Sequence, residues 1–138
     1  MKPRILFVDD EALVLQGLQR TLRTMRNEWE MTFVDSGAAA LEFMRATPVD
    51  VVVSDMRMPG MNGAQLLAEV MKQHPKTVRL VLSGHADQDL ILKCVGSTHQ
   101  YLSKPCEPEI LRSTVTRALD LEASLKNERL QKLIAQMD

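Results

Sequence analysis

Five short apolar runs, separated by longer segments with helical spacing, restrict the folds open to this chain of 138 residues. None of the runs alternates cleanly between apolar and polar residues, which indicates strands covered on both faces. Such strands are typical of parallel sheets, because the helices that connect parallel strands cover both faces of the sheet. The runs are residues 5–8, 31–34, 51–54, 78–82 and 100–102.

The segments between these runs carry helix signals. Ser36 and Asp87 are favourable N-caps, and Pro108 suits the first position of a final helix. Apolar residues recur at helical spacing in the first and third segments: Leu13, Leu18, Leu22, Met25, Leu66, Leu67, Val70 and Met71. The alternation predicts an α/β fold: a flavodoxin-like, doubly wound sheet of five parallel strands in the order 2-1-3-4-5, with helices on both faces and an extended C-terminal helix.

The last helical segment carries two apolar stripes. The first is suited to docking on the sheet and contains Leu111, Val115, Ala118 and Leu125. The second follows 4-3 spacing and contains Leu119, Ala123, Leu130, Leu133 and Met137. Three interpretations stay open: a solvated end, a linker helix, or a seam that pairs two copies into a homodimer. We expect one domain over 1–122 and a helical extension or linker toward an output domain over 123–138.

Composition excludes several classes of function. The formal net charge of −1 gives no reason to expect direct binding to nucleic acid or to an anionic membrane. Cys94 and Cys106 form neither a disulfide framework nor a zinc pattern. The apolar start of the chain is too short for a signal peptide, and no run approaches the length of a membrane span. We therefore expect a cytoplasmic protein.

Acidic residues follow two of the predicted strands. Asp9 and Asp10 come directly after the first strand, and Asp55 comes after the third. In the predicted strand order these two strands are neighbours, so their carboxyl ends meet at the switch point where such sheets bind ligands. Like charges about 4 Å apart repel by about 4 kcal/mol at an effective dielectric of 20, so the group needs a cation. Carboxylate oxygens are the ligands that Mg²⁺ prefers, which predicts a magnesium site.

A hydroxyl and an ammonium group are expected at the same edge of the sheet. Ser83 follows the fourth strand, and Lys104 follows the fifth. These are the groups that phosphoryl oxygens prefer beside Mg²⁺. A carboxylate can act as the nucleophile in phosphoryl transfer, giving an aspartyl phosphate. Asp55 is the candidate, because it stands alone on the central strand whereas Asp9 and Asp10 are paired.

Four motifs give the chain a close resemblance to a known family. They are "VDDE" at 8–11, "SDMRMPGMNG" at 54–63, "LSG" at 82–84 and "YLSKP" at 101–105. In order and spacing they resemble the receiver domain of two-component response regulators, over about residues 3–122. The resemblance implies a phosphorylation-activated signalling switch. Such a domain is not an enzyme; it assists its own phosphorylation and dephosphorylation.

The resemblance also implies roles for particular residues. Asp55 would accept a phosphoryl group from a histidine kinase or a phosphotransfer protein. Asp10 and Asp55 would bind Mg²⁺ with their side chains, Arg57 through its backbone carbonyl, and Asp9 through water. Lys104 would contact the phosphate, and the bond that follows it, to Pro105, would be cis.

A switch and its output follow from the same resemblance. Ser83 would move toward the phosphate, and the rotamer of Tyr101 would follow it. The surface of the fourth helix, fifth strand and fifth helix would then change and control an output domain or a separate effector. Arg57 and His85 occupy positions that tune phosphoryl lifetime in the family. The stretches 54–67 and 96–111 are also similar to receivers placed ahead of HD-type or HDOD output domains.

Three other functions compete with this interpretation. A phosphatase of the haloacid-dehalogenase type also uses an aspartate at a strand end, but it needs a second aspartate where this chain has Arg57. A flavin or nucleotide site would need hydroxyls and glycines after the first strand, where "DDEA" places repelling carboxylates instead. A degenerate receiver acting only as a scaffold stays open, although every expected acidic, hydroxyl and lysine position is filled.

Overall fold

Five parallel strands form one sheet in the order β2-β1-β3-β4-β5, which confirms the predicted fold. The computed structural model describes residues 2–84, 96, 98, 100–103 and 107–120. Each strand overlaps one of the five apolar runs. The strands are β1 (Arg4–Val8), β2 (Glu30–Val34), β3 (Val51–Asp55), β4 (Val78–Ser83) and β5 (Gln100–Ser103).

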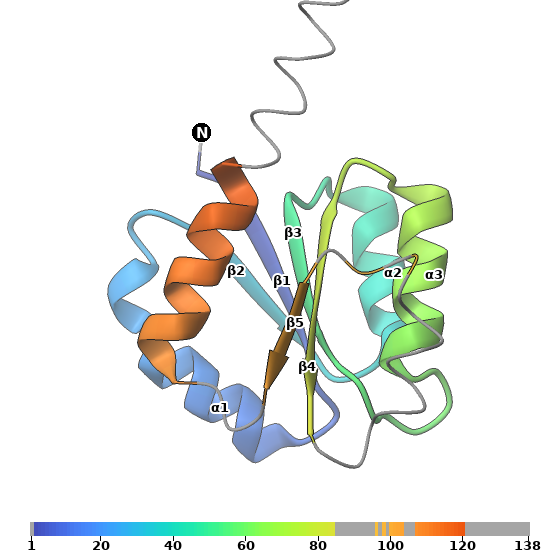
Figure 1. Cartoon of the computed structure of the whole chain (residues 1–138), viewed down its shortest axis with the longest axis horizontal. Coiled ribbons are helices and arrows are strands. Elements are labelled where there is room, and N and C mark those ends of the chain that lie inside the picture. The colour runs from blue at the N-terminus through green and yellow to red at the C-terminus, as the bar shows by residue number, and fades with distance from the viewer. Residues whose placement is uncertain (1, 85–95, 97, 99, 104–106, 121–138) are drawn as a thin grey trace, which may run out of the picture.

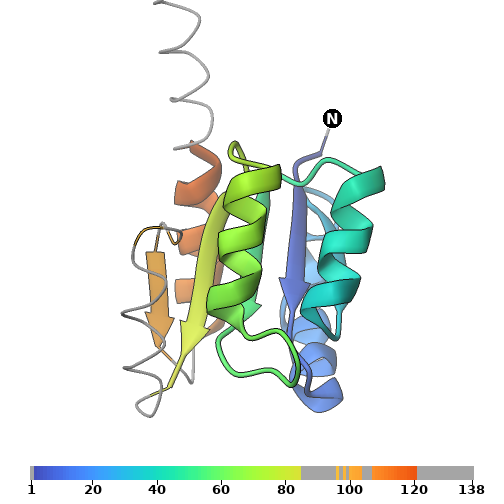
Figure 2. The same ribbon diagram turned by 90° about the vertical axis from the view of Figure 1, so that its right-hand side faces the viewer.

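Helices cover both faces of this sheet (Figures 1 and 2). One layer contains α2 (Gly37–Ala46) and α3 (Gly63–Gln73). The other contains α1 (Ala12–Thr21), the 3-10 helix η1 (Arg23–Met25) and a helix over 108–120. Within the described part of the chain, no helix has the length and apolar content needed to cross a membrane. The predicted fourth helix and the tail over 123–138 lie outside the described residues.

Two apolar clusters, one on each face, hold the layers together. Alternate residues of the strands point to opposite faces, so Val52 joins the cluster under α2 and α3, whereas Val51 and Val53 join the other. Every residue of β3 is buried, as expected for the central strand. Three residues of the first stripe of the last helix are buried as predicted, Leu111, Val115 and Ala118. Leu125 of that stripe lies outside the described residues.

Two apolar residues with helical spacing are not part of the core. Leu13 is 80% exposed and Met71 is 37% exposed. The first helical segment is also interrupted, because α1 ends at Thr21 and the chain continues as η1. Leu22 and Met25 are nevertheless buried. The spacing therefore located the helices correctly but overestimated the width of their buried stripes.

Candidate functional site

The register of the sheet brings carboxylates from two strands together. Val8 of β1 pairs with Ser54 of β3, so the next residues, Asp9 and Asp55, lie side by side at the carboxyl edge. Adjacent strands are about 4.8 Å apart. With Asp10, these residues offer three carboxylate oxygens that all lie within 4.8 Å of one another. The sequence-based prediction that the three acids meet in one place is confirmed.

Burial raises the electrostatic cost of bringing these carboxylates together. Asp9 is 1% exposed and Asp55 4%, whereas Asp10 is exposed. Two unit charges 4.8 Å apart repel by about 3 kcal/mol at an effective dielectric of 20. A Mg²⁺ ion with oxygens at about 2.1 Å holds its ligands about 3 to 4 Å apart. Two of the carboxylates could therefore reach such an ion directly and the third through a water molecule, and their hard oxygens suit its chemistry.

Backbone contacts fix the position of Asp9. Its N–H donates to the carbonyl of Val34 in the edge strand, at 3.1 Å. Its carboxylate Oδ1 accepts a hydrogen bond from the N–H of Glu11, at 2.9 Å. Glu11 is the N-cap of α1, so this carboxylate satisfies one of the backbone donors at the start of the helix. The same side chain thus starts the helix and contributes to the acidic cluster.

The loop between β3 and α3 is tied closely to the acidic cluster. Met56 donates its N–H to the carbonyl of Leu82 at 3.0 Å, and Gly63 donates its N–H to the carbonyl of Met56 at 2.7 Å. A Cβ atom at Gly63 would lie 2.4 Å from the carbonyl oxygen of Asp55, a separation that real side chains do not adopt. Gly63 therefore permits α3 to begin directly against the backbone of Asp55.

A capping box begins α3, and it was not predicted. The Asn62 side chain accepts the N–H of Gln65 at 2.9 Å, and the Gln65 side chain accepts the N–H of Asn62 at 3.0 Å. The signal is present in the sequence, because an N-cap residue followed three positions later by Gln is typical of this motif. The box fixes the helix start that packs against Asp55.

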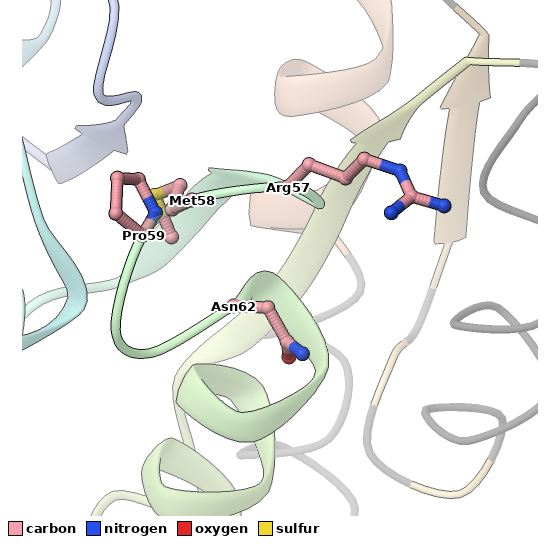
Figure 3. A pocket seen from close by; sticks show the side chains of 4 residues that line it. All are labelled: Arg57, Met58, Pro59 and Asn62. Atoms are coloured by element: carbon pink, nitrogen blue, oxygen red, sulfur yellow. The ribbon is translucent and has the colours of Figure 1, made fainter.

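Arg57 lies beside the acidic cluster on the same loop. Its side chain is exposed and lines a cavity of about 370 Å³ with Met58, Pro59 and Asn62. Figure 3 shows the Arg57 side chain extending away from Met58 and Pro59. Arg57 is close to Asp55 in the chain, since only Met56 separates the two.

The hydroxyl expected at this edge lies at the end of β4. Ser83 is 8% exposed and is in register with Ser103 of β5. Tyr101 pairs with Val81 in the same ladder; its side chain is half-buried and packs against the cluster under α2 and α3. Lys104 and His85 lie outside the described residues.

Comparison with known proteins connects this site to a family. The family model for the response regulator receiver domain matches residues 5–116. The chain is 36% identical over 120 residues to the hydrogenase transcriptional regulatory protein HoxA of Cupriavidus necator, covering 86% of this chain and 24% of HoxA. It is 31% identical over 113 residues to the DNA-binding transcriptional regulator NtrC of Escherichia coli, covering 81% and 24%. The chain thus spans about a quarter of the length of these curated relatives.

Solved structures give the same result. The signal receiver domain of an HD domain-containing protein from Pseudomonas fluorescens Pf-5 is 33% identical, with a TM-score of 0.84. The match covers 90% of this chain and 99% of that domain. Parallel order 2-1-3-4-5, the acidic cluster and the family match agree with one another. The chain belongs to the receiver domain family of response regulators, the phosphorylation-activated switches of two-component signalling.

Proposed function

We propose that Asp55 is the phosphoacceptor of this receiver domain. The observation that carries the proposal is the meeting of three carboxylates within 4.8 Å, with Asp55 at the end of the central strand. Asp9 and Asp10 come from the neighbouring strand end and are poised to hold a cation. Asp55 is left as the carboxylate that can act as a nucleophile.

The reaction exchanges one bond to phosphorus for another. An oxygen of the Asp55 carboxylate attacks phosphorus, and the bond from phosphorus to the donor nitrogen of a phosphohistidine breaks. The electron pair of that bond stays with the histidine nitrogen. Dephosphorylation is the attack of water on the same phosphorus, which returns the carboxylate and releases inorganic phosphate. We propose that the domain assists both steps by positioning groups around phosphorus, as phosphoryl transfer requires little other chemistry from a protein.

Magnesium is the cation that these residues suit. Asp10 and Asp55 would hold it with their side chains, Arg57 with its backbone carbonyl, and Asp9 through water. When bound, Mg²⁺ supplies neutralisation of the phosphoryl oxygens. Lys104 would offer a second positive charge from the end of β5. The chain itself contributes the fixed geometry: the Glu11 N–H holds Asp9, and the Gly63 contact holds the backbone of Asp55.

Phosphorylation of Asp55 would change a surface that includes β5 and the last helix. The added group brings about −1.5 to −2 charges and three acceptor oxygens. Ser83, at the end of β4, would donate to one of them, and the half-buried Tyr101 would turn toward the space that Ser83 leaves. The surface that includes β5 and the helix over 108–120 would then favour a different partner state.

Arg57 is proposed to set the lifetime of the phosphoryl group, together with His85. The Arg57 side chain is exposed, lies two residues after Asp55 and lines a cavity of about 370 Å³. Removal of this bulk and charge in Arg57→Ala should speed hydrolysis of the aspartyl phosphate. Loss of label over time, compared between the two proteins, measures the effect.

The partners follow from the family. We propose that a histidine kinase or phosphotransfer protein donates the phosphoryl group in the cytoplasm, without direct contact to nucleic acid or membrane. An output domain or separate effector would respond. Similarity to HoxA supports a transcriptional output, and similarity to the receiver of an HD domain-containing protein supports an HD-type or HDOD output. The intact mass and domain content of the native protein, isolated from its source, distinguish these outputs.

The segment over 123–138 is proposed to be a helical linker that can pair two copies. The support is the 4-3 spacing of one stripe of apolar residues, Leu119, Ala123, Leu130, Leu133 and Met137. Light scattering should detect dimers that vanish when the chain is truncated after Leu121. A monomer at high concentration would reject the pairing but not the phosphoacceptor.

Intact mass tests the proposed function directly. Treatment with acetyl phosphate and Mg²⁺ should add one phosphoryl group to the wild type and none to Asp55→Asn. Absence of the added mass with this donor and with a phosphohistidine donor would favour the degenerate scaffold. A steady, Asp55-dependent multiple turnover of a generic phosphomonoester would favour the haloacid-dehalogenase type of phosphatase instead.

A further inference from the structure

A groove with a positively charged rim lies along β2, the outermost strand on one side of the sheet. This groove of about 540 Å³ runs between this edge strand and the helices α1 and η1. The walls carry Arg20, Arg23 and Arg26, and the floor contains Met31 and Phe33 of β2. Figure 1 shows β2 at the border of the sheet, next to the blue α1. In the described part of the chain no acidic side chain lines this groove. An adjoining cavity shares Gln16, Gln19 and Phe33 with it and is lined by Asp10 and Asp35, so the acidic segment of a ligand would have to lie at the arginine end.

The floor of the groove is apolar and packs against the core. Met31 and Phe33 are half-buried and pack against the core cluster that includes Phe7, Leu22 and Met25. The Phe33 ring stacks on Phe7 with centroids 5.0 Å apart and an interplanar angle of 11°. An apolar side chain that enters the groove would therefore meet a preformed surface.

The backbone of β2 presents free hydrogen-bonding positions at this groove. Glu30 donates its N–H to Pro3, and Val34 accepts the N–H of Asp9. In a parallel ladder the residues that bond to one neighbour alternate along the strand. Residues 30, 32 and 34 therefore face β1, and the N–H and C=O groups of Met31 and Phe33 face outward. An extended chain could pair with them as an additional strand.

The rim is positively charged. Across the residues that the structure describes, no ion pair or hydrogen bond engages the guanidinium groups of Arg20, Arg23 or Arg26. Lys2 does not line the groove, but its Nζ donates to the carbonyl of Arg26 at 3.1 Å. The nearby Glu30 is paired with Arg4 and does not line the groove.

We propose that this groove docks an extended, acidic peptide segment of a partner protein. The segment would pair with the outward backbone groups of β2, place apolar side chains on Met31 and Phe33, and direct carboxylates to the three arginines. Edge strands are also protected from pairing by charges on the strand itself. Here the two residues whose backbone groups face outward, Met31 and Phe33, have apolar side chains. The arginines lie on α1, on η1 and at the end of η1. This arrangement favours pairing with an anionic chain.

Titration of the ¹⁵N-labelled chain tests the proposal. The probe is a capped hexapeptide of alternating glutamate and valine, and the matched control is the lysine–valine peptide. The glutamate peptide should shift the amide signals of Met31 and Phe33, and the lysine peptide should not. Asp55→Asn should bind the glutamate peptide as the wild type does, because docking requires none of the proposed phosphoryl chemistry.

Charge reversal sharpens the test. Arg20→Glu with Arg23→Glu should weaken binding of the glutamate peptide by about tenfold, since two attractive pairs become repulsive. Arg45→Glu with Arg117→Glu makes the same change in net charge at exposed positions outside the groove and should have little effect. Circular dichroism and thermal melting verify that both variants are folded.

Three results would overturn the proposal. The first is an absence of shifts at Met31 and Phe33, and the second is equal binding of the glutamate and lysine peptides. The third is a single-stranded oligothymidylate that shifts the same signals more strongly than the peptide, which would make the groove a nucleic acid site.

Discussion

Polar side chains have different surroundings at the amino ends and at the carboxyl ends of the strands, called here the amino edge and the carboxyl edge. At the amino edge two polar side chains make local hydrogen bonds: the Thr77 hydroxyl donates to the carbonyl of Val49 at 2.7 Å, and the Asp50 carboxylate accepts the N–H of Arg4 at 2.8 Å. At the carboxyl edge, three carboxylates lie within 4.8 Å of one another. The first arrangement stabilises the fold, whereas the second gathers like charges that a cation would neutralise.

A buried cation makes the contrast clearer. Burial lowers the pKa of Arg79 below its ordinary value, because the charged form loses hydration. Its Nη1 nevertheless donates to the carbonyl of Thr77 at 3.1 Å, near the amino edge. The side chain is thus held by the backbone around it. The three carboxylates at the carboxyl edge instead repel one another, so each raises the free energy of the other two.

The largest expected effect concerns the backbone at the carboxyl edge. Gly63→Ala places a Cβ atom 2.4 Å from the carbonyl oxygen of Asp55, and 2.9 Å from the Cα of Met56. Backbone atoms cannot yield as a flexible side chain does, so we expect a loss of about 3 kcal/mol in the free energy of unfolding. Urea unfolding measures it, and phosphoryl uptake should fall because the backbone of Asp55 must move.

Gly17→Ala is the matched control for that substitution. A Cβ atom at Gly17 meets no heavy atom within 4 Å, and the residue lies inside α1. The same chemical change should therefore raise stability by about 0.5 to 1 kcal/mol through helix propensity. Equal effects at the two glycines would show that close approach at Gly63 is not what holds the site.

The amino edge supplies the next effect. Thr77→Val keeps the shape of the side chain but removes the donor to Val49, at a position that is 4% exposed. A buried carbonyl that loses its partner costs about 2 kcal/mol, measurable by urea unfolding. Thr116→Val removes a similar bond to Arg112 on an exposed helix surface, where water replaces it, so stability should change by less than about 0.5 kcal/mol. An unchanged Thr77→Val protein would remove the claimed difference between the edges.

Magnesium should produce the third effect, at the carboxyl edge alone. At ten times its dissociation constant Mg²⁺ should raise the free energy of unfolding by about 1.4 kcal/mol. Asp10→Asn should lose most of this gain and, in EDTA, be more stable than the wild type because one repelling charge is gone. Asp35→Asn, an exposed carboxylate outside the acidic cluster, should respond to Mg²⁺ as the wild type does. Identical unfolding curves for the wild type with and without millimolar Mg²⁺ would reject the metal site.

The sequence could predict features that depend on strand order and local patterns, but not those that depend on distances between chain segments. Asp9 and Asp55 were placed together because strand order and in-phase strand ends are enough to align them. Leu13 and Met71 were misleading, since helical spacing shows which residues share a face but not how far the sheet covers that face. The role of Gly63 depends on a distance between two chain segments, which no local pattern contains. The capping box at Asn62 and Gln65 was readable and was missed.

The smallest expected effect tests whether the charges attract one another at the amino edge and repel one another at the carboxyl edge. Glu30→Gln removes the Arg4–Glu30 pair at the amino edge, where Nε and Oε2 are 3.0 Å apart and both side chains are partly exposed. Solvent screening limits the loss of stability to about 0.5 kcal/mol. Salt should weaken this attraction but relieve the repulsion among Asp9, Asp10 and Asp55. In EDTA, added NaCl should therefore stabilise Glu30→Gln more than the wild type, and Asp10→Asn less. The same response in all three proteins would mean that the charges at the two edges do not differ in kind.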